Sequence, residues 1–202
     1  SQLLSMLHVL IAEDHEIVRV GTSLLIREMF PSAVIDEAED FFRALKLLDE
    51  KKYDLLLLDI NISGGNSIGM IEVVRQRQQD VPLLVFSSYD EDLFALRFLE
   101  AGANGFVSKD APIEEIRLAI RTVAEKRDYV SDRAQQQLLT LFKGKGTNKV
   151  AGLASLSDRE TEIMYLLIKG AGTKEISTLL NLQKNTISTY KARIFKKLKV
   201  DN

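Results

Sequence analysis

The chain has 202 residues, 28% of them charged and 46% hydrophobic, which suits a globular protein with room for two small domains. It has no cysteine, so we expect neither disulfides nor a cysteine-bound zinc. No apolar run comes near the roughly 20 residues of a membrane span, and no Lys or Arg precedes Arg19. We therefore expect a cytoplasmic protein without a membrane segment or a cationic signal peptide. Its net charge of −2 is uneven: residues 1–127 carry 14 Lys and Arg against 22 Asp and Glu, and residues 151–202 carry 9 against 5, which favours a cation or regulatory site first and a polyanion-binding module last.

Residues 7–126 alternate short β-branched or leucine-rich runs with longer amphipathic stretches, and this pattern predicts five βα units. The run Leu55–Leu58 has no polar residue, as expected of a parallel strand covered by helices on both faces. We therefore predict an α/β fold with a five-stranded, doubly wound parallel sheet in a flavodoxin-like order. The predicted strands are Leu7–Ala12, Ala33–Glu37, Asp54–Asp59, Val81–Ser87 and Gly105–Ser108, and the predicted helices lie near 15–29, 40–50, 67–79, 91–101 and 113–126.

The strand pattern stops after residue 127, so we predict a first domain over 1–127 and a linker over 128–154. The linker begins with a glutamine-rich amphipathic piece, Ser131–Phe142. The basic, glycine-containing stretch 143–149 follows and is typical of a flexible connection.

Residues 155–202 have the periodicity of helices throughout, so we predict a second, smaller, all-α domain there. Ser157 and Glu160 form a capping-box pattern, because a serine oxygen can accept from the Glu160 amide while that carboxylate reaches back. Gly170 and Gly172 end this first helix.

Two further helices are predicted after these glycines. Thr173 is the expected cap of the short helix Lys174–Leu180, and the turn 181–183 separates it from a longer basic helix, Asn185–Lys199. A short helix, a tight turn and a longer basic helix are the outline of a helix-turn-helix.

Polar side chains follow four of the five predicted strands, at the edge where ligands of open parallel sheets bind. Glu13 and Asp14 follow the first strand, Asp59 ends the third, Ser87 ends the fourth and Lys109 follows the fifth. Carboxylates this close repel one another unless a cation lies among them, and all-oxygen ligands favour Mg²⁺. With that metal, Asp59 can attack phosphorus and form an aspartyl phosphate, Lys109 can balance its charge and Ser87 can donate to a phosphoryl oxygen.

In order and spacing these residues resemble the receiver domain of response regulators over the first 127 residues, and Gly105–Asp110 resembles the fifth-strand motif of that family. The resemblance implies that Asp59 is the phosphoacceptor. It also implies two further sets: metal ligands Glu13, Asp14, Asp59 and the backbone carbonyl of Asn61, and switch residues Ser87 and Phe106.

The loop after the third strand departs from the family pattern. Ser63 stands where the family usually has proline, and Ser67 stands where it has glycine. Because a fixed proline dihedral is lost while Gly64 and Gly65 remain, we expect a less rigid loop.

The last 50 or so residues resemble a LuxR-type helix-turn-helix of the NarL/FixJ class. The resemblance is carried by Leu156–Glu160, Lys174–Ile176, Asn185–Ser188 and Lys196–Val200. In the third helix, Ile187, Ile194 and Leu198 form a buried stripe. The recognition helix of such a motif enters the major groove, and basic side chains bind phosphates. The residues expected at DNA are Thr173, Lys174, Lys184, Thr186, Ser188, Thr189, Lys191, Ala192, Arg193 and Lys196, with Lys197 also available for phosphates.

The leading hypothesis joins both ends of the chain into one two-component regulator. A sensor histidine kinase would phosphorylate Asp59, and the added charge would shift a two-state receiver towards a homodimer that binds double-stranded DNA. We expect only Mg²⁺-dependent self-phosphorylation and self-dephosphorylation, and so no enzyme with a separate substrate.

Two alternatives stay open. A phosphorylation-controlled adaptor whose helical tail binds RNA or protein would lack the salt-dependent affinity for duplex DNA that a DNA binder shows. A metal-dependent phosphatase with Asp59 as nucleophile would turn over phosphate esters continuously. The sequence offers that phosphatase no separate general acid beside Asp59, so we rank it last.

Overall fold

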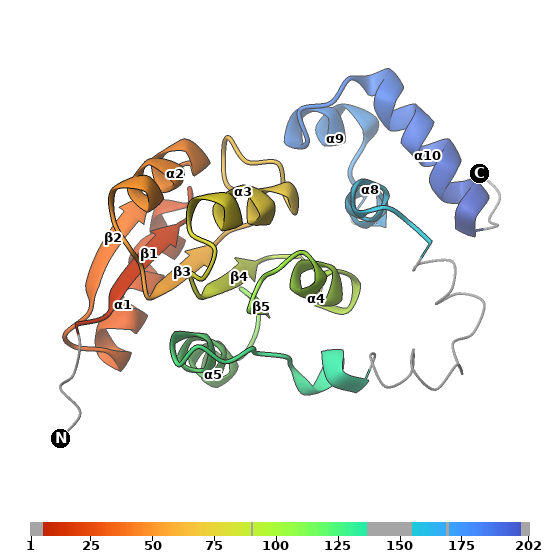
Figure 1. Cartoon of the computed structure of the whole chain (residues 1–202). Coiled ribbons are helices and arrows are strands. Elements are labelled where there is room, and N and C mark those ends of the chain that lie inside the picture. Colours follow the sequence, from red (N-terminus) through yellow and green to blue (C-terminus); the bar gives the residue numbers. More distant parts are fainter. Residues whose placement is uncertain (1–5, 90, 137–154, 169, 199–202) are drawn as a thin grey trace. The chain divides into compact units, whose positions relative to one another are not determined.

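The computed structural model describes residues 6–89, 91–136, 155–168 and 170–198. The chain forms two compact units, Ser1–Gln135 and Gln136–Asn202. The first unit is a sheet with helices on both faces, and the described part of the second unit consists of helices (Figure 1).

The sheet of the first unit is parallel throughout and has the strand order β2-β1-β3-β4-β5. The strand order reverses between β1 and β3, and ligands of such sheets bind at the carboxyl ends of the strands beside this point. The prediction of a five-stranded, flavodoxin-like sheet is therefore confirmed. The strands are β1 (His8–Ala12), β2 (Val34–Ala38), β3 (Leu55–Leu58), β4 (Leu83–Ser87) and β5 (Gly105–Ser108).

Helices cover both faces of this sheet. One face packs on α1 and α5, with Val9, Leu55 and Leu57 in a core shared with Ile26 and Ile120, and α2, α3 and α4 lie on the other face (Figure 1). Burial on both sides explains why the strand sequences are apolar without alternation. The helices are α1 (Glu16–Met29), α2 (Phe41–Glu50), α3 (Gly69–Arg77), α4 (Glu91–Glu100) and α5 (Ile113–Ala124).

The observed strands are shorter than the predicted ones at several ends. Asp59 directly follows β3, because its N–H donates to the carbonyl of Ala12 while its own carbonyl accepts from Ile62 in a turn. Strand β4 begins at Leu83, after Pro82, which has no N–H to donate to the ladder.

Helix α3 begins at Gly69, two residues later than predicted, because Ser67 has a positive φ of 62°. The left-handed region costs an L-residue with a Cβ roughly 1 to 2 kcal/mol. Ser67 therefore holds a strained conformation at the position where the sequence departs from glycine.

Glycine at position 67 is expected to stabilise the protein. Ser67→Gly should raise the free energy of unfolding by roughly 1 kcal/mol, because relief of the strain exceeds the extra chain entropy of an unfolded glycine. Urea unfolding measures the change. Ser67→Ala, which keeps the Cβ, is the control, and an equal gain in both variants would contradict the backbone explanation.

The first unit extends beyond the predicted boundary at residue 127. The side chain of Tyr129 is buried, and the backbone N–H of Tyr129 donates to the carbonyl of Asn104 over 2.8 Å. Tyr129 also forms an isolated parallel β-bridge with Gly105. Ser131 then caps a helical turn by accepting from the N–H of Ala134 over 3.1 Å. These residues, predicted to belong to the linker, pack on the sheet unit, and residues 137–154 of the predicted linker lie outside the described residues.

The second unit contains α8 (Asp158–Ile168), α9 (Thr173–Leu179) and α10 (Lys184–Leu198). The predicted capping box is confirmed: the N–H of Ser157 donates to Glu160 over 2.7 Å, and the N–H of Glu160 donates to the Ser157 hydroxyl over 3.3 Å. The predicted cap of α9 is wrong, because Gly172 occupies the extended cap position and Thr173 is already the first residue of the helix.

Apolar residues of α10 face the interior of this unit, as predicted. Ile187 and Ile194 are buried and Leu198 is half-buried. Among the helices that the structure describes, none combines the length and apolar character that crossing a bilayer needs.

Candidate functional site

Carboxylates gather where β1 and β3 end. Glu13 and Asp14 follow β1, Asp59 follows β3, and the N–H of Asp59 donates to Ala12, so the two strand ends lie side by side. One ligand atom from each of these residues and from His15 lies within 4.8 Å of the others. The sequence prediction that the carboxylates meet at this edge is correct for all three.

Lys109 from the end of β5 reaches the same cluster. Its Nζ lies 2.9 Å from Oδ2 of Asp59 and forms an ion pair with Oε2 of Glu13, and all three side chains are largely buried. The other oxygen of Asp59 accepts a hydrogen bond from the N–H of Asn61 over 2.9 Å. Asp59 is thus held at both oxygens, and Lys109 supplies the positive charge closest to it.

Burial raises the pKa of Asp59 above its ordinary value. Lys109 and the N–H of Asn61 act in the opposite direction, and the charge of Glu13 adds to the rise. An acid whose pKa is raised by folding favours its protonated form in the folded state, so its ionisation lowers stability as the pH rises through the folded-state pKa.

Asp59→Asn is therefore expected to raise the melting temperature of the metal-free protein near neutral pH. The gain should shrink as the pH falls towards the ordinary aspartate value of 3.8, where the carboxyl is protonated in both states. Circular dichroism melts between about pH 4 and pH 8 measure it. Asp110→Asn at an exposed position is the control, and a gain that does not depend on pH would contradict this account.

Asp14 is held by the loop after β3. The N–H and the hydroxyl of Ser63 both donate to Oδ2 of Asp14, over 3.1 and 2.8 Å. Proline, which the family usually has here, offers neither donor. The expected loss of rigidity at this position is thus opposed by two hydrogen bonds that the sequence did not reveal.

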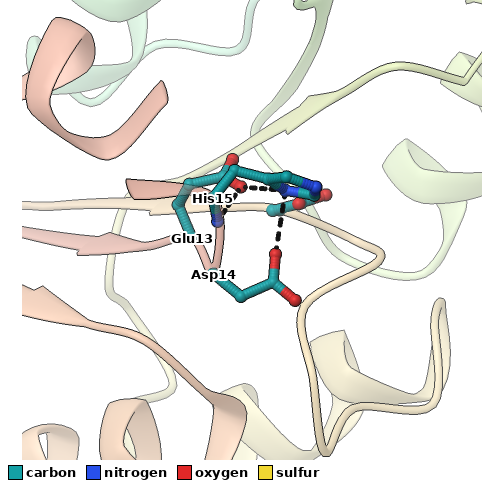
Figure 2. A group of neighbouring side chains, drawn as sticks. Glu13, Asp14 and His15 are labelled. Atoms are coloured by element: carbon teal, nitrogen blue, oxygen red, sulfur yellow. Dashed lines mark hydrogen bonds and ion pairs between the residues drawn. The ribbon is translucent and has the colours of Figure 1, made fainter. Parts of the chain in front are cut away.

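His15 is the site residue that sequence reasoning missed. Its Nδ1 lies 2.9 Å from Oε1 of Glu13 and 3.0 Å from Oδ1 of Asp14, and Figure 2 shows the ring against both carboxylates. The available signal was its place directly after the acidic pair, since any residue there lies at the ligand-binding edge of the sheet.

Ser87, at the end of β4, and Phe106, within β5, are both buried. The Ser87 hydroxyl accepts from the N–H of Tyr89 over 3.1 Å, and its carbonyl accepts from the N–H of Lys109 over 2.8 Å. The ring of Phe106 stacks on Phe98 with centroids 5.4 Å apart. The hydrogen bond between the two backbones thus connects Ser87 to Lys109. The switch roles of Ser87 and Phe106 stay predictions.

The donor set at this edge fits a hard divalent cation. Oε2 of Glu13 and Oδ1 of Asp14 are buried and have no hydrogen-bond partner in the described part of the chain, although both take part in ion pairs. Carboxylate oxygens are the ligands that Mg²⁺ prefers. The contribution of the Asn61 carbonyl stays a prediction of the resemblance.

Comparison with known proteins decides the family. Residues 9–121 match the family model of the response regulator receiver domain, and residues 154–202 match that of bacterial regulatory proteins of the luxR family. The chain belongs to the response regulators. With a receiver domain and a LuxR-type DNA-binding domain, it is a phosphorylation-controlled transcriptional regulator.

Relatives of this response regulator match along almost the whole chain. It is 33% identical to the response regulator GacA of Pseudomonas aeruginosa, over 96% of this chain and 91% of GacA. It is 32% identical to the response regulator UvrY of Escherichia coli K12, over 96% of this chain and 89% of UvrY. A solved structure of RcsB from Salmonella enterica serovar Typhimurium has the same fold, with a TM-score of 0.70 and 23% identity over 98% of this chain and 95% of RcsB.

The response regulator exposes most of the predicted DNA contacts on α10. Ser188, Thr189, Ala192 and Lys196 are exposed and lie opposite the buried Ile194. Further exposed residues of the prediction are Lys174, Lys184 and Arg193, and the half-buried ones are Thr173, Thr186 and Lys191. Their DNA contacts stay predictions, and the exposed face is the one a recognition helix would present.

One lysine is already engaged within the protein. Lys197 donates to the carbonyl of Ser155 over 3.0 Å and to Oε2 of Glu160 over 2.7 Å. The expectation that Lys197 is available for phosphates therefore needs correction, because its ammonium ties α10 to the start of α8.

Proposed function

We propose that Asp59 of this regulator accepts a phosphoryl group from a sensor histidine kinase. The observation that carries the proposal is that Asp59 lies in one cluster with Glu13 and Asp14 and is paired with Lys109. In the transfer, a carboxylate oxygen of Asp59 forms a bond to phosphorus while the bond from phosphorus to the kinase histidine nitrogen breaks, and the histidine keeps the electron pair.

Mg²⁺ is the proposed cofactor of this step. Glu13, Asp14, Asp59 and the carbonyl of Asn61 would hold it, and it would neutralise phosphoryl oxygens beside the carboxylates. Lys109 would place its positive charge next to the new acyl phosphate and so stabilise it.

Ser87 is the proposed link to the switch. Its hydroxyl accepts from Tyr89 and so retains its own proton, which it can donate to a phosphoryl oxygen. Movement of Ser87 towards the phosphate would then free space for Phe106, as the family resemblance implies. The added charge would favour a homodimer that places two copies of α10 on duplex DNA.

Phosphorylation of Asp59 is proposed to be stoichiometric, and no continuous turnover of phosphate esters is expected. The proposed location is the cytoplasm, where kinase domain and DNA are both accessible. RcsB, a relative in fold, was solved bound to a promoter in the presence of the phosphomimetic BeF₃⁻.

The test treats the full chain with acetyl phosphate or with beryllofluoride, each with Mg²⁺. Intact-mass spectrometry after acetyl phosphate should show one added phosphoryl group, and light scattering and duplex-DNA binding should show dimerisation and tighter binding after either treatment. DNA affinity should fall steeply with salt, which the adaptor alternative does not predict.

Asp59→Ala should abolish every response, and Asp110→Ala, at an exposed position next to Lys109, should retain them all. A response of Asp59→Ala equal to that of the wild type would refute the proposed function. Steady release of phosphate from esters would favour the phosphatase alternative instead.

A further inference from the structure

We infer that His15 is an additional ligand of the divalent cation and shifts the preference of the site from Mg²⁺ towards Mn²⁺. This inference rests on the proposed cation site, which by family resemblance has oxygen ligands alone. It concerns a residue that lies outside that ligand set.

The distances around His15 match those between neighbouring ligands of one metal ion. Two adjacent ligands of an octahedral ion with bonds of about 2.1 Å lie about 3.0 Å apart. Nδ1 of His15 lies 2.9 Å from Oε1 of Glu13 and 3.0 Å from Oδ1 of Asp14. Nδ1 of His15 thus has, to each of these two oxygens, the spacing of a neighbouring ligand in one coordination shell (Figure 2).

The carboxylate oxygens nearby are available for a cation. Oδ2 of Asp14 is occupied by Ser63, which leaves the buried Oδ1 beside His15 without a hydrogen bond. The second buried oxygen without a hydrogen bond is Oε2 of Glu13, a residue that is almost fully buried. This oxygen forms an ion pair with Lys109. Within the described part of the chain, both buried oxygens thus lack a hydrogen-bond donor, as expected of oxygens that bind a cation.

Packing does not explain the position of the His15 ring. Its side chain is 68% exposed, yet it lies against the carboxylates. The backbone N–H of His15 already donates to Oε1 of Glu13 over 2.9 Å, so that oxygen has a donor without the ring. A ring that carries its proton on Nε2, towards solvent, can present the lone pair of Nδ1 to a metal.

An imidazole ligand changes which cation the site prefers. Mg²⁺ favours oxygen ligands, whereas imidazole nitrogen suits transition metals, whose affinity for a nitrogen-containing site rises from Mn²⁺ onwards. His15 should therefore increase the affinity for Mn²⁺ far more than that for Mg²⁺.

Pulsed electron paramagnetic resonance on the Mn²⁺-loaded full chain is the decisive measurement. The wild-type spectrum should show coupling of Mn²⁺ to an imidazole nitrogen, and His15→Ala should lose it. Titrations should show Mn²⁺ affinity falling roughly tenfold in His15→Ala and Mg²⁺ affinity changing by less than about twofold. His8→Ala, at the opposite end of β1, is the control and should change neither.

The outcomes separate this inference from the proposed function. Wild-type protein that binds Mn²⁺ and Mg²⁺ without any nitrogen coupling overturns the role of His15 and leaves the oxygen site intact. An equal loss of both affinities in His15→Ala also overturns it, since His15 would then only position Glu13. Wild-type protein that binds neither metal overturns the cation site itself.

Discussion

Replacement of Lys109 by methionine is expected to lower the free energy of unfolding of the metal-free protein by about 3 kcal/mol. Methionine preserves most of the apolar stem but removes the ammonium that pairs with both Asp59 and Glu13. Two buried carboxylates then lie together without a counter-charge. Breaking a buried ion pair by removing one partner is among the costliest single changes in proteins.

The loss should depend on pH and on metal. Burial already raises the pKa of Asp59, and removal of Lys109 raises it further, because Lys109 favours the ionised form. The carboxyl can therefore escape the penalty by taking up a proton, so the destabilisation should be smaller near pH 5 than near pH 8. Saturating Mg²⁺ should restore most of the stability, since a divalent cation replaces the missing charge.

Urea unfolding at both pH values, with and without Mg²⁺, measures these effects. Lys46→Met, an exposed lysine with an ion pair on the surface of α2, is the control and should cost less than about 1 kcal/mol. Destabilisation that Mg²⁺ fails to reverse would show that Lys109 acts through packing and not through its charge.

The carboxylate site was predictable because it depends on topology. The carboxyl ends of parallel strands meet at one edge, so a sequence that places Glu13, Asp14, Asp59 and Lys109 after three strands already brings them together. The exact strand ends were less predictable: Asp59 leaves the strand in a turn whose hydrogen bonds depend on the neighbouring β1.

Two features of the site were not predictable, because they depend on the path of a loop and on a side-chain rotamer. The tether from Ser63 to Asp14 joins residues 49 positions apart, and no local pattern fixes their distance. The position of the His15 ring depends on its χ angles. Neither the periodicity of apolar residues nor the spacing of motifs along the sequence gives information about these angles.

In the second unit, too, a local sequence pattern was predictable and a contact between distant residues was not. The capping box at Ser157 is a local pattern and was predicted, whereas the bond between Lys197 and Glu160 joins two helices and was not. From the sequence, Lys196 and Lys197 were both expected to be available for phosphates. Only the fold distinguishes Lys196, on the exposed face, from Lys197, which binds within the unit.

Glu160→Ala is expected to lower the stability of the α8–α10 unit by about 2 kcal/mol. The buried carboxylate accepts from the N–H of Ser157 and from Lys197, each over 2.7 Å. Its removal deletes half of the capping box and leaves the ammonium of Lys197 without its acidic partner. Helix α8 then loses both its start signal and its connection to the recognition helix.

The pH dependence of this loss follows from Glu160 itself. Burial acts to raise the pKa of Glu160, but the hydrogen bonds from Lys197 and Ser157 outweigh it and hold this pKa below the ordinary value of 4.5. A lowered pKa contributes stability that is present above the unfolded value and is lost as the pH falls through the folded value. The difference between wild type and Glu160→Ala should therefore be constant near neutral pH and shrink below about pH 4.

Hydrogen exchange of the α8 and α10 amides in the full chain measures this stability without separating the units. Lys197→Met should raise exchange in both helices, because it removes the other half of the ion pair. Lys196→Met is the matched control: it should leave exchange unchanged and weaken duplex-DNA binding, since its ammonium is exposed on the predicted recognition face. If the two lysine variants behaved alike in both measurements, the division of α10 into a structural and a DNA-facing side would be wrong, because the same charge change on either side would then have the same effect.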